Sequence, residues 1–351
     1  MAFKIGSTTV VDDSAAVYDG GNRILRKINN VLPNANGDIA VTTMAGDPGV
    51  NVATGTPSTY FYRTVITKGF MLGGYKDSSP WKNVNRVVMA TDVTTNLGDQ
   101  LTRGGSYISG GFDEVGNMAG AFATADAYAG SSSATSLFNM TTEAGIADSA
   151  GYNMHVSRDS CGSMQHLVNR YTYVVGGGSD STSKIMWATG TNTSTTAPGS
   201  AGNHTGSIWG ETNGQVTITN SKYHFTYSSE TWAGWGTPSG IDGCQKGLST
   251  KLGWGYIGRD GNCGSSSGFD KYLNSTGAWL MGTMAKPRDC GEENYITGQY
   301  HGYCLGLYNN SAQSNESFKW YYLTDVGMML GSAGQPKGHD GCSSGGGVSG
   351  V

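Results

Sequence analysis

The chain has 351 residues, of which 56 are glycine and only 14% are charged, and its formal net charge is −4. Its 19 Tyr, 9 Phe and 8 Trp residues exclude an intrinsically disordered chain, because such chains are poor in aromatics and rich in charge. Lys and Arg form no basic cluster and no apolar run is long enough to span a membrane, so we expect neither nucleic-acid binding nor membrane insertion. Abundant Gly, Asn, Ser and Thr predict an all-β protein with many tight turns.

Residues 1–45 are predicted to form a small attachment or oligomerisation segment. Residues 3–11 alternate like a strand, 22–29 fit a short turn of helix or a further strand, and 33–38 fit a turn. The segment has too few apolar residues for a core of its own, so it needs a partner surface on the rest of the chain or on other subunits. The residues expected at that surface are Ile24, Leu25, Ile28, Val31, Leu32, Pro33, Gly37, Ile39 and Val41.

A repeat begins after a Gly-, Pro-, Ala- and Thr-rich linker at 46–59. Across 60–335, an apolar run ends in a glycine-centred turn, a polar loop follows, and a second apolar run usually ends in Thr, Ser or Asp. The average step of about 46 residues matches the four-stranded blade of a β-propeller. Inner strands would need the small glycines, and outer strands would carry aromatics that pack between blades. The turns are centred on Gly74, Gly120, Gly177, Gly210, Gly258 and Gly306.

We therefore predict a Gly-rich all-β domain that is a propeller of about six blades, with a β-sandwich or a trimeric β-prism as alternatives. The double glycines Gly73-Gly74 and Gly177-Gly178, and the runs VVMATDVTT and KWYYLTDVG, resemble kelch repeats. Residues 336–351 are Gly/Ser-rich and are predicted to be a flexible tail or a segment ordered only by its neighbours.

No catalytic motif such as HExxH, a P-loop or GxSxG occurs in the sequence. Adjacent acidic residues on a strand face opposite ways, so such pairs do not form the two-carboxylate site of a glycosidase. Residues 258–262 (GRDGN) fit a turn better than a calcium loop. We expect no enzyme, no metal and no cofactor. The acidic pairs are Asp12/Asp13, Asp113/Glu114 and Glu292/Glu293, and the scattered histidines are His155, His166, His204, His224, His301 and His339.

The six cysteines all lie in the second half of the chain and include no CxxC pair. Buried thiols are the first interpretation and disulfides the second, and six cysteines allow about 15 pairings between which the sequence does not choose. His339 and Cys342 alone fall short of a zinc site. The cysteines are Cys161, Cys244, Cys263, Cys290, Cys304 and Cys342.

Aromatic residues beside the Gly-rich turns are the candidates for ligand binding. An aromatic face surrounded by Asn, Ser and Thr suits a sugar, although packing between blades is the competing role for any single tryptophan. The candidates are Trp209, Trp232, Trp235 and Trp254.

The N-terminus carries a family resemblance. FKIGSTTVVDDSAAV is similar to the "I-x-G-T-T-V-I-D-x-S-R-x-L" opening of bacteriophage tail-fibre and virion appendage proteins, and KINNVLPNANGDIAVTT resembles their "V-N-G-x-x-P-D-x-x-G-N-V-x-L" element. Asn29-Asn30 replaces the usual Asn-Gly, Asn34 replaces Asp, and Asp38 replaces Asn. The resemblance implies a fibre that is usually trimeric, in which neighbouring copies would cover the apolar segment.

From this resemblance we expect a structural component of a phage virion, made in the host cytoplasm. It would be a tail fibre or appendage that binds the host surface, most simply a glycan, and its partners would be further copies of itself, other virion proteins and a host glycan or protein. One alternative is a head, neck or capsid decoration protein or a fibre without receptor binding. The other is a tailspike-like glycan depolymerase.

Overall fold

The computed structural model of the protein describes four short strands between residues 4 and 26 and most of residues 66–350. The chain divides into two compact units, Met1–Tyr62 and Arg63–Val351. Within 66–350 the residues outside the description are 77–78, 106–107, 125–131, 159–160, 197, 199–204, 219–220, 235–246, 251–252, 260–267, 286–293, 299, 310–311 and 332–345.

The first unit contains two strand pairs. β1 (Lys4–Ile5) pairs antiparallel with β2 (Thr8–Thr9), so the single strand expected over 3–11 is wrong, because this stretch holds two paired strands. β3 (Ala16–Asp19) pairs with β4 (Asn22–Arg26), which selects the strand over the helical turn for this stretch and places Ile24 and Leu25 in β4. The other expected oligomerisation residues lie outside the described ones: Ile28, Val31, Leu32, Pro33, Gly37, Ile39 and Val41.

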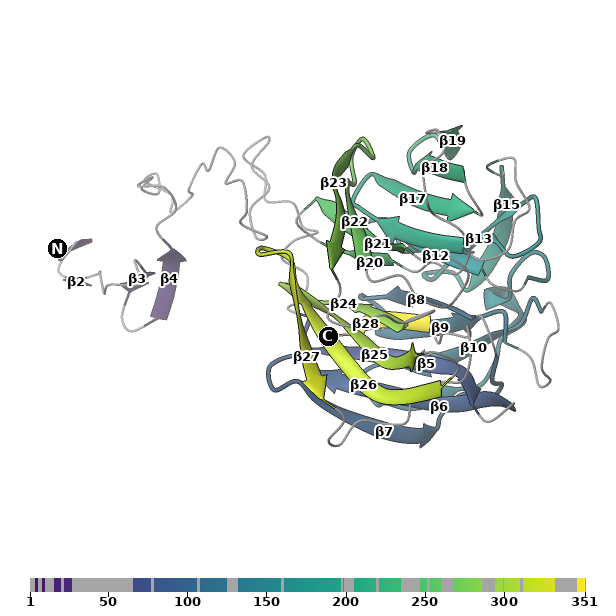
Figure 1. The fold of residues 1–351 in the computed structure, drawn as a ribbon, viewed down its shortest axis with the longest axis horizontal. Helices are drawn as coiled ribbons and strands as arrows, with labels where there is room; N and C mark the ends of the chain where they lie inside the picture. The colour runs from purple at the N-terminus through teal and green to yellow at the C-terminus, as the bar shows by residue number, and fades with distance from the viewer. Residues whose placement is uncertain are drawn as a thin grey trace. The chain divides into compact units, whose positions relative to one another are not determined.

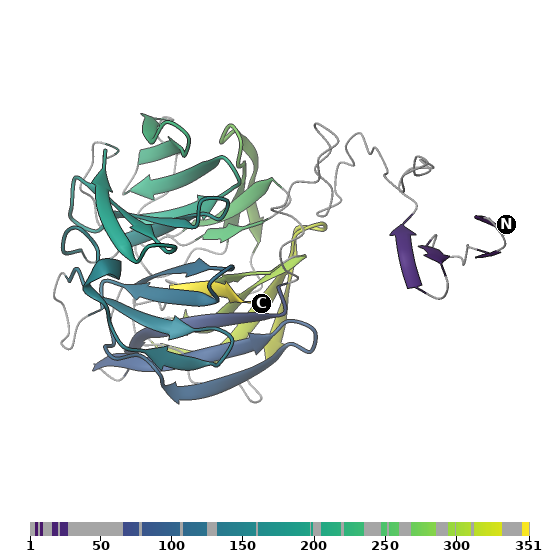
Figure 2. The ribbon, with the colours of Figure 1, turned by 180° about the vertical axis from the view of Figure 1, so that it is seen from behind.

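The second unit is a six-bladed β-propeller, as the repeat predicted, and not a sandwich or prism. Six four-stranded antiparallel sheets stand in a ring (Figures 1 and 2). Each sheet is a blade, and its strands follow one another from the innermost to the outermost. In this order blade 1 has β28 (Gly346–Gly350), β5 (Lys68–Lys76), β6 (Ser79–Val88) and β7 (Val93–Asp99); blade 2 has β8 (Ser109–Asp113), β9 (Met118–Phe122), β10 (Thr135–Asn139) and β11 (Ala144–Ile146).

Blades 3 to 6 follow in the same order around the ring. Blade 3 has β12 (Cys161–His166), β13 (Tyr171–Gly176), β14 (Thr182–Met186) and β15 (Thr191–Thr195); blade 4 has β16 (Thr205–Trp209), β17 (Asn213–Ile218), β18 (Ser221–Thr226) and β19 (Thr231–Gly234). Blade 5 has β20 (Gly247–Ser249), β21 (Trp254–Arg259), β22 (Gly268–Leu273) and β23 (Trp279–Ala285); blade 6 has β24 (Asn294–Thr297), β25 (His301–Asn309), β26 (Ala312–Tyr321) and β27 (Val326–Gly331). One short 3-10 helix, η1 (Ala150–Tyr152), lies between blades 2 and 3.

Blade 1 closes the ring, because it is built from both ends of the second unit. β28 pairs antiparallel with β5, and Gly350 lies opposite Lys68. The stretch 336–351, expected to be a tail, therefore supplies the innermost strand of a blade. Val348 of this strand is 1% exposed, so β28 is packed into the ring as well as hydrogen-bonded to it.

The glycines at the centres of the predicted turns lie in or beside the second strand of the blades rather than the inner strand. Gly74, Gly120 and Gly258 lie in β5, β9 and β21, Gly306 lies in β25, and Gly177 directly follows β13. Gly210 is out of register, because it follows inner strand β16, which explains the uneven spacing around it. The ring is consistent with the kelch-like pattern.

Aromatic side chains fill the interfaces between blades, but they come from the second and third strands and not from the outer strands as expected. Trp320 of β26 and Phe269 of β22 are fully buried with ring centroids 4.8 Å apart, and Tyr256 of β21 joins the same cluster. On an outer strand, Trp232 of β19 is only half-buried.

The inner strands approach so closely that their shared positions need glycine or serine. A Cβ on Gly347 of β28 would lie 1.7 Å from the carbonyl oxygen of Tyr295 in β24. Elsewhere serine hydroxyls join neighbouring inner strands: Ser207 Oγ donates to Ser163 O at 2.7 Å, and Trp209 N donates to Ser249 Oγ at 2.8 Å. The ring is thus tied together around its axis by backbone contacts and hydroxyl groups.

Candidate recognition surface

The propeller has two different faces. Inner-to-second and third-to-outer strand connections meet at one end of the blades, which we call the short-turn face; these are turns such as 114–117 and 227–230. Second-to-third connections and those between blades leave the strands at the other end, which we call the loop face; in the sequence these connections include 123–134, 147–160 and 332–345. Both Lys68 and Gly350 lie at the short-turn face, so the chain enters and closes the propeller there.

Ion pairs tie neighbouring blades together at the short-turn face. Between blades 6 and 1, Lys319 Nζ donates to the Asp92 carboxylate at 2.8 and 3.1 Å, and the Tyr303 hydroxyl donates to the same carboxylate. Lys319 and Tyr303 are cross-strand partners on β26 and β25, whereas Asp92 sits in the turn before β7 with φ 58°. We call this arrangement of a base, a tyrosine and a turn acid a clasp.

The same clasp recurs at two further interfaces. In each, a third-strand lysine and its second-strand tyrosine partner hold an acid from the next blade's turn, with closest nitrogen–oxygen distances of 2.9 Å and 2.5 Å. Both turn acids also have positive φ. The groups are Lys271, Tyr256 and Asp325 between blades 5 and 6, and Lys184, Tyr173 and Glu230 between blades 3 and 4.

A fourth clasp, between blades 1 and 2, has a second base in place of the tyrosine. Arg86 Nη1 and Lys68 Nζ each contact Glu143 at 2.6 Å, while Phe70 occupies the position of the tyrosine. Burial alone would raise the pKa of Glu143, but the hydrogen bonds from Arg86 and Lys68 outweigh it and lower that pKa. The balance of burial against hydrogen bonds likewise lowers the pKa of Asp92.

The two remaining interfaces have neither the turn acid nor the matching third-strand base of a clasp, although Arg170 pairs with Asp113 at 2.6 Å between blades 2 and 3. Where the turn residue is Gly190, the preceding blade has Leu137, and where it is Gly277, the preceding blade has His224. At the second of these, Gln215 takes the tyrosine's position and donates to Leu273 O at 2.8 Å. Base and acid are thus present together or replaced together, so the clasps are part of the fold and hold the blades in register.

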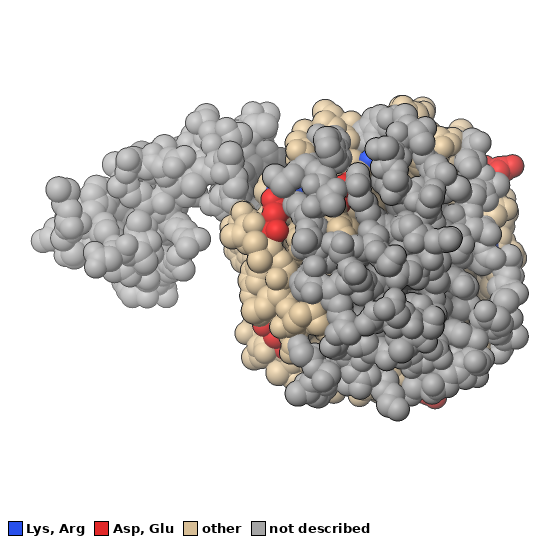
Figure 3. All heavy atoms as spheres, in the orientation of Figure 1, with Lys and Arg blue, Asp and Glu red and all other residues tan. Residues whose placement is uncertain are grey.

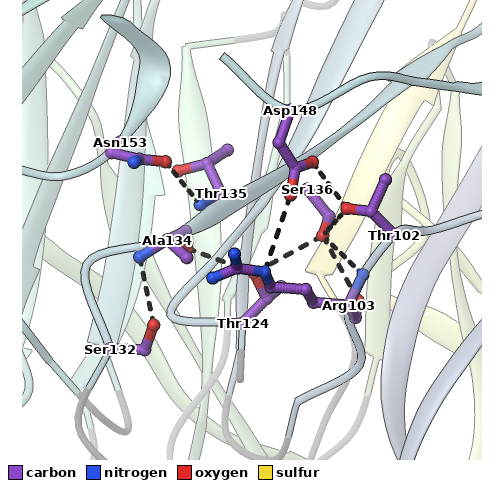
Figure 4. Close-up of polar contacts among 9 residues, drawn as sticks. All are labelled: Thr102, Arg103, Thr124, Ser132, Ala134, Thr135, Ser136, Asp148 and Asn153. Atoms are coloured by element: carbon purple, nitrogen blue, oxygen red, sulfur yellow. Dashed lines mark hydrogen bonds and ion pairs between the residues drawn. The ribbon is translucent and has the colours of Figure 1, made fainter. Parts of the chain in front are cut away.

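A hydroxyl-rich cluster lies at the loop face between blades 1 and 2 (Figure 4). Thr102 donates to Asp148 Oδ1 at 2.6 Å, and its hydroxyl lies 3.0 Å from Ser136 Oγ, which also accepts Arg103 N at 3.0 Å. Arg103 Nε lies 3.7 Å from Asp148 Oδ2. This network joins the connection after β7 to that after β11, and the Arg103 side chain at its edge is 45% exposed.

Further hydrogen bonds beside this cluster join other connections of the loop face to one another. Thr135 N donates to Asn153 Oδ1 at 3.1 Å, and Ser132 and Arg158 exchange backbone hydrogen bonds. The fully buried Arg158 guanidinium donates to the carbonyl oxygens of Gly176 and Ser181, and burial lowers its pKa. Three connections of the loop face are therefore held together by hydroxyl, amide and backbone groups and by the charged side chains of Arg103, Asp148 and Arg158. On the face seen in Figure 3, the described residues show few atoms of Lys, Arg, Asp or Glu.

The structure does not gather the candidate tryptophans into one platform. Trp209 is buried at the end of β16, with its ring 5.9 Å from that of Phe112. Trp254 packs beneath Lys271, whose Nζ lies 4.4 Å from the ring. Trp232 is half-buried on β19 and donates from Nε1 to a backbone oxygen. Trp235 lies outside the described residues and directly follows β19 in the sequence.

The scattered histidines and acids have separate structural roles where they are described. His166 stacks on Tyr227 at 4.5 Å, and burial lowers its pKa to about 4. His301 lies 2.9 Å from the Tyr303 hydroxyl, and burial, followed by repulsion from Lys319, lowers its pKa to about 4. Asp113 is buried and accepts from Val115 N and Gly116 N, whereas Glu114 is half-buried.

Two cysteines lie within the described part of the chain. Cys161 and Cys304 are buried thiols, as the first interpretation proposed; Cys244, Cys263, Cys290, Cys342 and His339 lie outside the described residues. Among the described residues no three His, Cys, Asp or Glu side chains are grouped as a metal site. None of the helical segments in that part of the chain is long and apolar enough to cross a membrane.

Comparison with known proteins identifies no relative: no protein-family model matches the sequence, and no curated protein matches it either.

Proposed function

We propose that the chain is a phage virion appendage protein whose propeller binds the host surface through its loop face. The observation that carries this proposal is the separation of the two faces. The chain enters the propeller at the short-turn face, where all connections are short, and the long connections leave from the opposite end. An appendage attached through its N-terminal unit would present those connections outward.

The chemistry of the long connections favours a glycan. Segments such as 196–204 (TAPGSAGNH) and 260–267 (DGNCGSSS) are rich in hydroxyl, amide and backbone groups and poor in aliphatic side chains. Hydroxyls of a sugar exchange hydrogen bonds with such groups, and an aromatic ring nearby adds a stacking surface. Trp235, in the connection after β19, is the tryptophan best placed in the sequence for this role.

Attachment to the virion is supported by the N-terminal resemblance to tail-fibre proteins. Residues 1–45 would bind other copies and other virion proteins, and a trimer is the assembly that the resemblance implies. The clasps fit this role, because they add fixed contacts to a ring that has to survive outside a cell.

The test is binding of the full-length protein to surface polysaccharides purified from a panel of bacteria, with reducing ends assayed in parallel. We expect saturable binding without release of reducing ends, and a loss of about tenfold for Trp235→Ala, the size of one good aromatic contact. Val168→Ser, which changes an exposed residue of the short-turn face, is the control and should bind normally. Steady release of reducing ends would establish a depolymerase, and binding to capsids alone would establish a decoration protein.

A further inference from the structure

The outer hairpin of blade 6 exposes a cluster of large apolar side chains. Leu323, Val326 and Met328 are 59%, 56% and 44% exposed, and Tyr300 of the same blade is 48% exposed. Tyr300 lies beside this hairpin, because its carbonyl oxygen accepts the hydrogen bond of Tyr322 N at 3.2 Å. These four residues, which we call the blade 6 patch, are half of the exposed large hydrophobic residues in the described part of the chain.

The internal repeat shows that the fold does not require these residues. The turn residue Asp325 of blade 6 corresponds to Gly190 of blade 3, and both have positive φ. The same alignment pairs Leu323 with Ala188, Val326 with Thr191 and Met328 with Thr193, and all three blade 3 residues are exposed. Since an equivalent hairpin forms with Ala and Thr, the apolar side chains of blade 6 call for another explanation.

The patch lies next to the point where the chain enters the propeller. Ile66 is buried between blades 6 and 1, against Ile296 and Tyr303. Thr67 O accepts the backbone N–H of Met89, and a Cβ on Gly298, in the blade 6 turn that leads to Tyr300, would meet the Met89 sulfur at 2.8 Å. Copies joined through residues before Ile66 would therefore be tethered at the same end of the propeller as their blade 6 patches.

We propose that the blade 6 patch packs against the blade 6 patches of neighbouring copies of this chain. This inference rests on the self-association in the proposed function, and it extends the contact from the N-terminal unit to the propeller. Each copy of a symmetric assembly presents the same patch, and β27 has the sequence VGMMLG, without a charge that would repel its copies. β27 is also the outermost strand of its sheet, so its outer edge has no strand partner among the described residues.

The experiment gives the blade 6 hairpin the residues of blade 3. The variant Leu323→Ala/Val326→Thr/Met328→Thr is made in the full-length chain, and the control Val93→Thr/Leu280→Thr changes equally exposed residues of blades 1 and 5. Mass is measured by light scattering over a dilution series. We expect a trimer for the unchanged protein and the control, and dissociation at a concentration at least about tenfold higher for the blade 6 variant.

The proposal is overturned if the blade 6 variant dissociates at the same concentration as the unchanged protein, or if the unchanged protein is a monomer throughout. Thermal unfolding should be nearly equal for all three proteins, and because blade 3 already uses these residues, a misfolded variant would also count against the argument. Polysaccharide binding per chain should be unchanged in the variant. A dissociating variant of a protein that binds no polysaccharide would leave the patch contact standing and refute the recognition role instead.

Discussion

Replacing the clasp between blades 6 and 1 tests whether matched charges hold the ring. Asp92→Gly removes the acid and leaves the Lys319 ammonium, whose side chain is only 10% exposed, without its carboxylate. Removing one partner of a buried pair costs about 3–5 kcal/mol. The Asp92 side chain is 30% exposed, so solvent screens the pair, and glycine relieves the positive φ. We therefore expect a loss of about 2 kcal/mol.

The double variant should lose less than the single one. Lys319→Leu with Asp92→Gly reproduces the Leu137 and Gly190 combination that the chain itself uses between blades 2 and 3. Both charges are removed together, so neither is left buried without its partner. The Tyr303 hydroxyl still has an acceptor in Met89 O at 3.2 Å. Lys319→Leu alone should cost about 1–2 kcal/mol, and the double variant about 0–1 kcal/mol, which is a coupling of about 2 kcal/mol or more.

Urea unfolding of the four proteins, followed by tryptophan fluorescence, measures these free energies, provided that the dependence on urea is the same for all of them. A double variant that loses the sum of the two single losses would refute the idea that base and acid are kept or replaced as a pair.

Three further predictions concern acid, packing and recognition. Folding lowers the pKa values of Asp92 and Glu143, so their contribution to stability is present above the ordinary values of 3.8 and 4.5 and is lost as the pH falls through the lower folded values. Unfolding measured by fluorescence between pH 5 and pH 2 should therefore show that the variant Lys319→Leu/Asp92→Gly loses less stability on acidification than the unchanged protein. Equal losses of stability would contradict this prediction. Gly347→Ala should destabilise the propeller by about 3 kcal/mol because its Cβ would overlap Tyr295 O, whereas Gly234→Ala, with nothing within 4 Å, should change the urea midpoint little; similar midpoints would argue against the close approach of β28 and β24. Trp209→Ala should lower thermal stability through loss of a buried side chain, whereas Trp235→Ala should leave it unchanged and weaken polysaccharide binding; the reverse pattern would contradict the assignment of the two tryptophans.

The repeat made the propeller predictable, because glycines recur where each second strand meets crowded neighbours. The repeat length remained recognisable although one of the six glycines, Gly210, is out of register with the others. Gly210 precedes the second strand of blade 4, because β17 begins only at Asn213. What the sequence could not show was β28: GGVSG has one large side chain and no alternation, and it becomes a strand because β5 offers it an unpaired edge.

The clasps were only partly visible in the sequence. The recurring Thr, Ser or Asp after each second apolar run marked the turn, yet the acid there pairs with a base of the preceding blade, far away in the chain. Lys319 and Asp92, for example, meet only because the ring closes. Aligning the blades by their turn residue shows that base and acid are kept or replaced as a pair. Leu137 and His224 occupy the third-strand position of the clasp base, and in both cases the turn of the next blade has glycine in place of the acid. The tryptophans carried no such signal, because aromatic residues pack between blades and also bind ligands.

Closure of the ring by β28 joins the two ends of the second unit in one blade, and hydrogen exchange of the full-length protein tests it most directly. We predict that the amides of β28 exchange as slowly as those of β12, an inner strand joined to its blade by a short turn, because both open only with global unfolding. Fast exchange across Gly346–Gly350 with slow exchange in β12 would contradict closure of the ring.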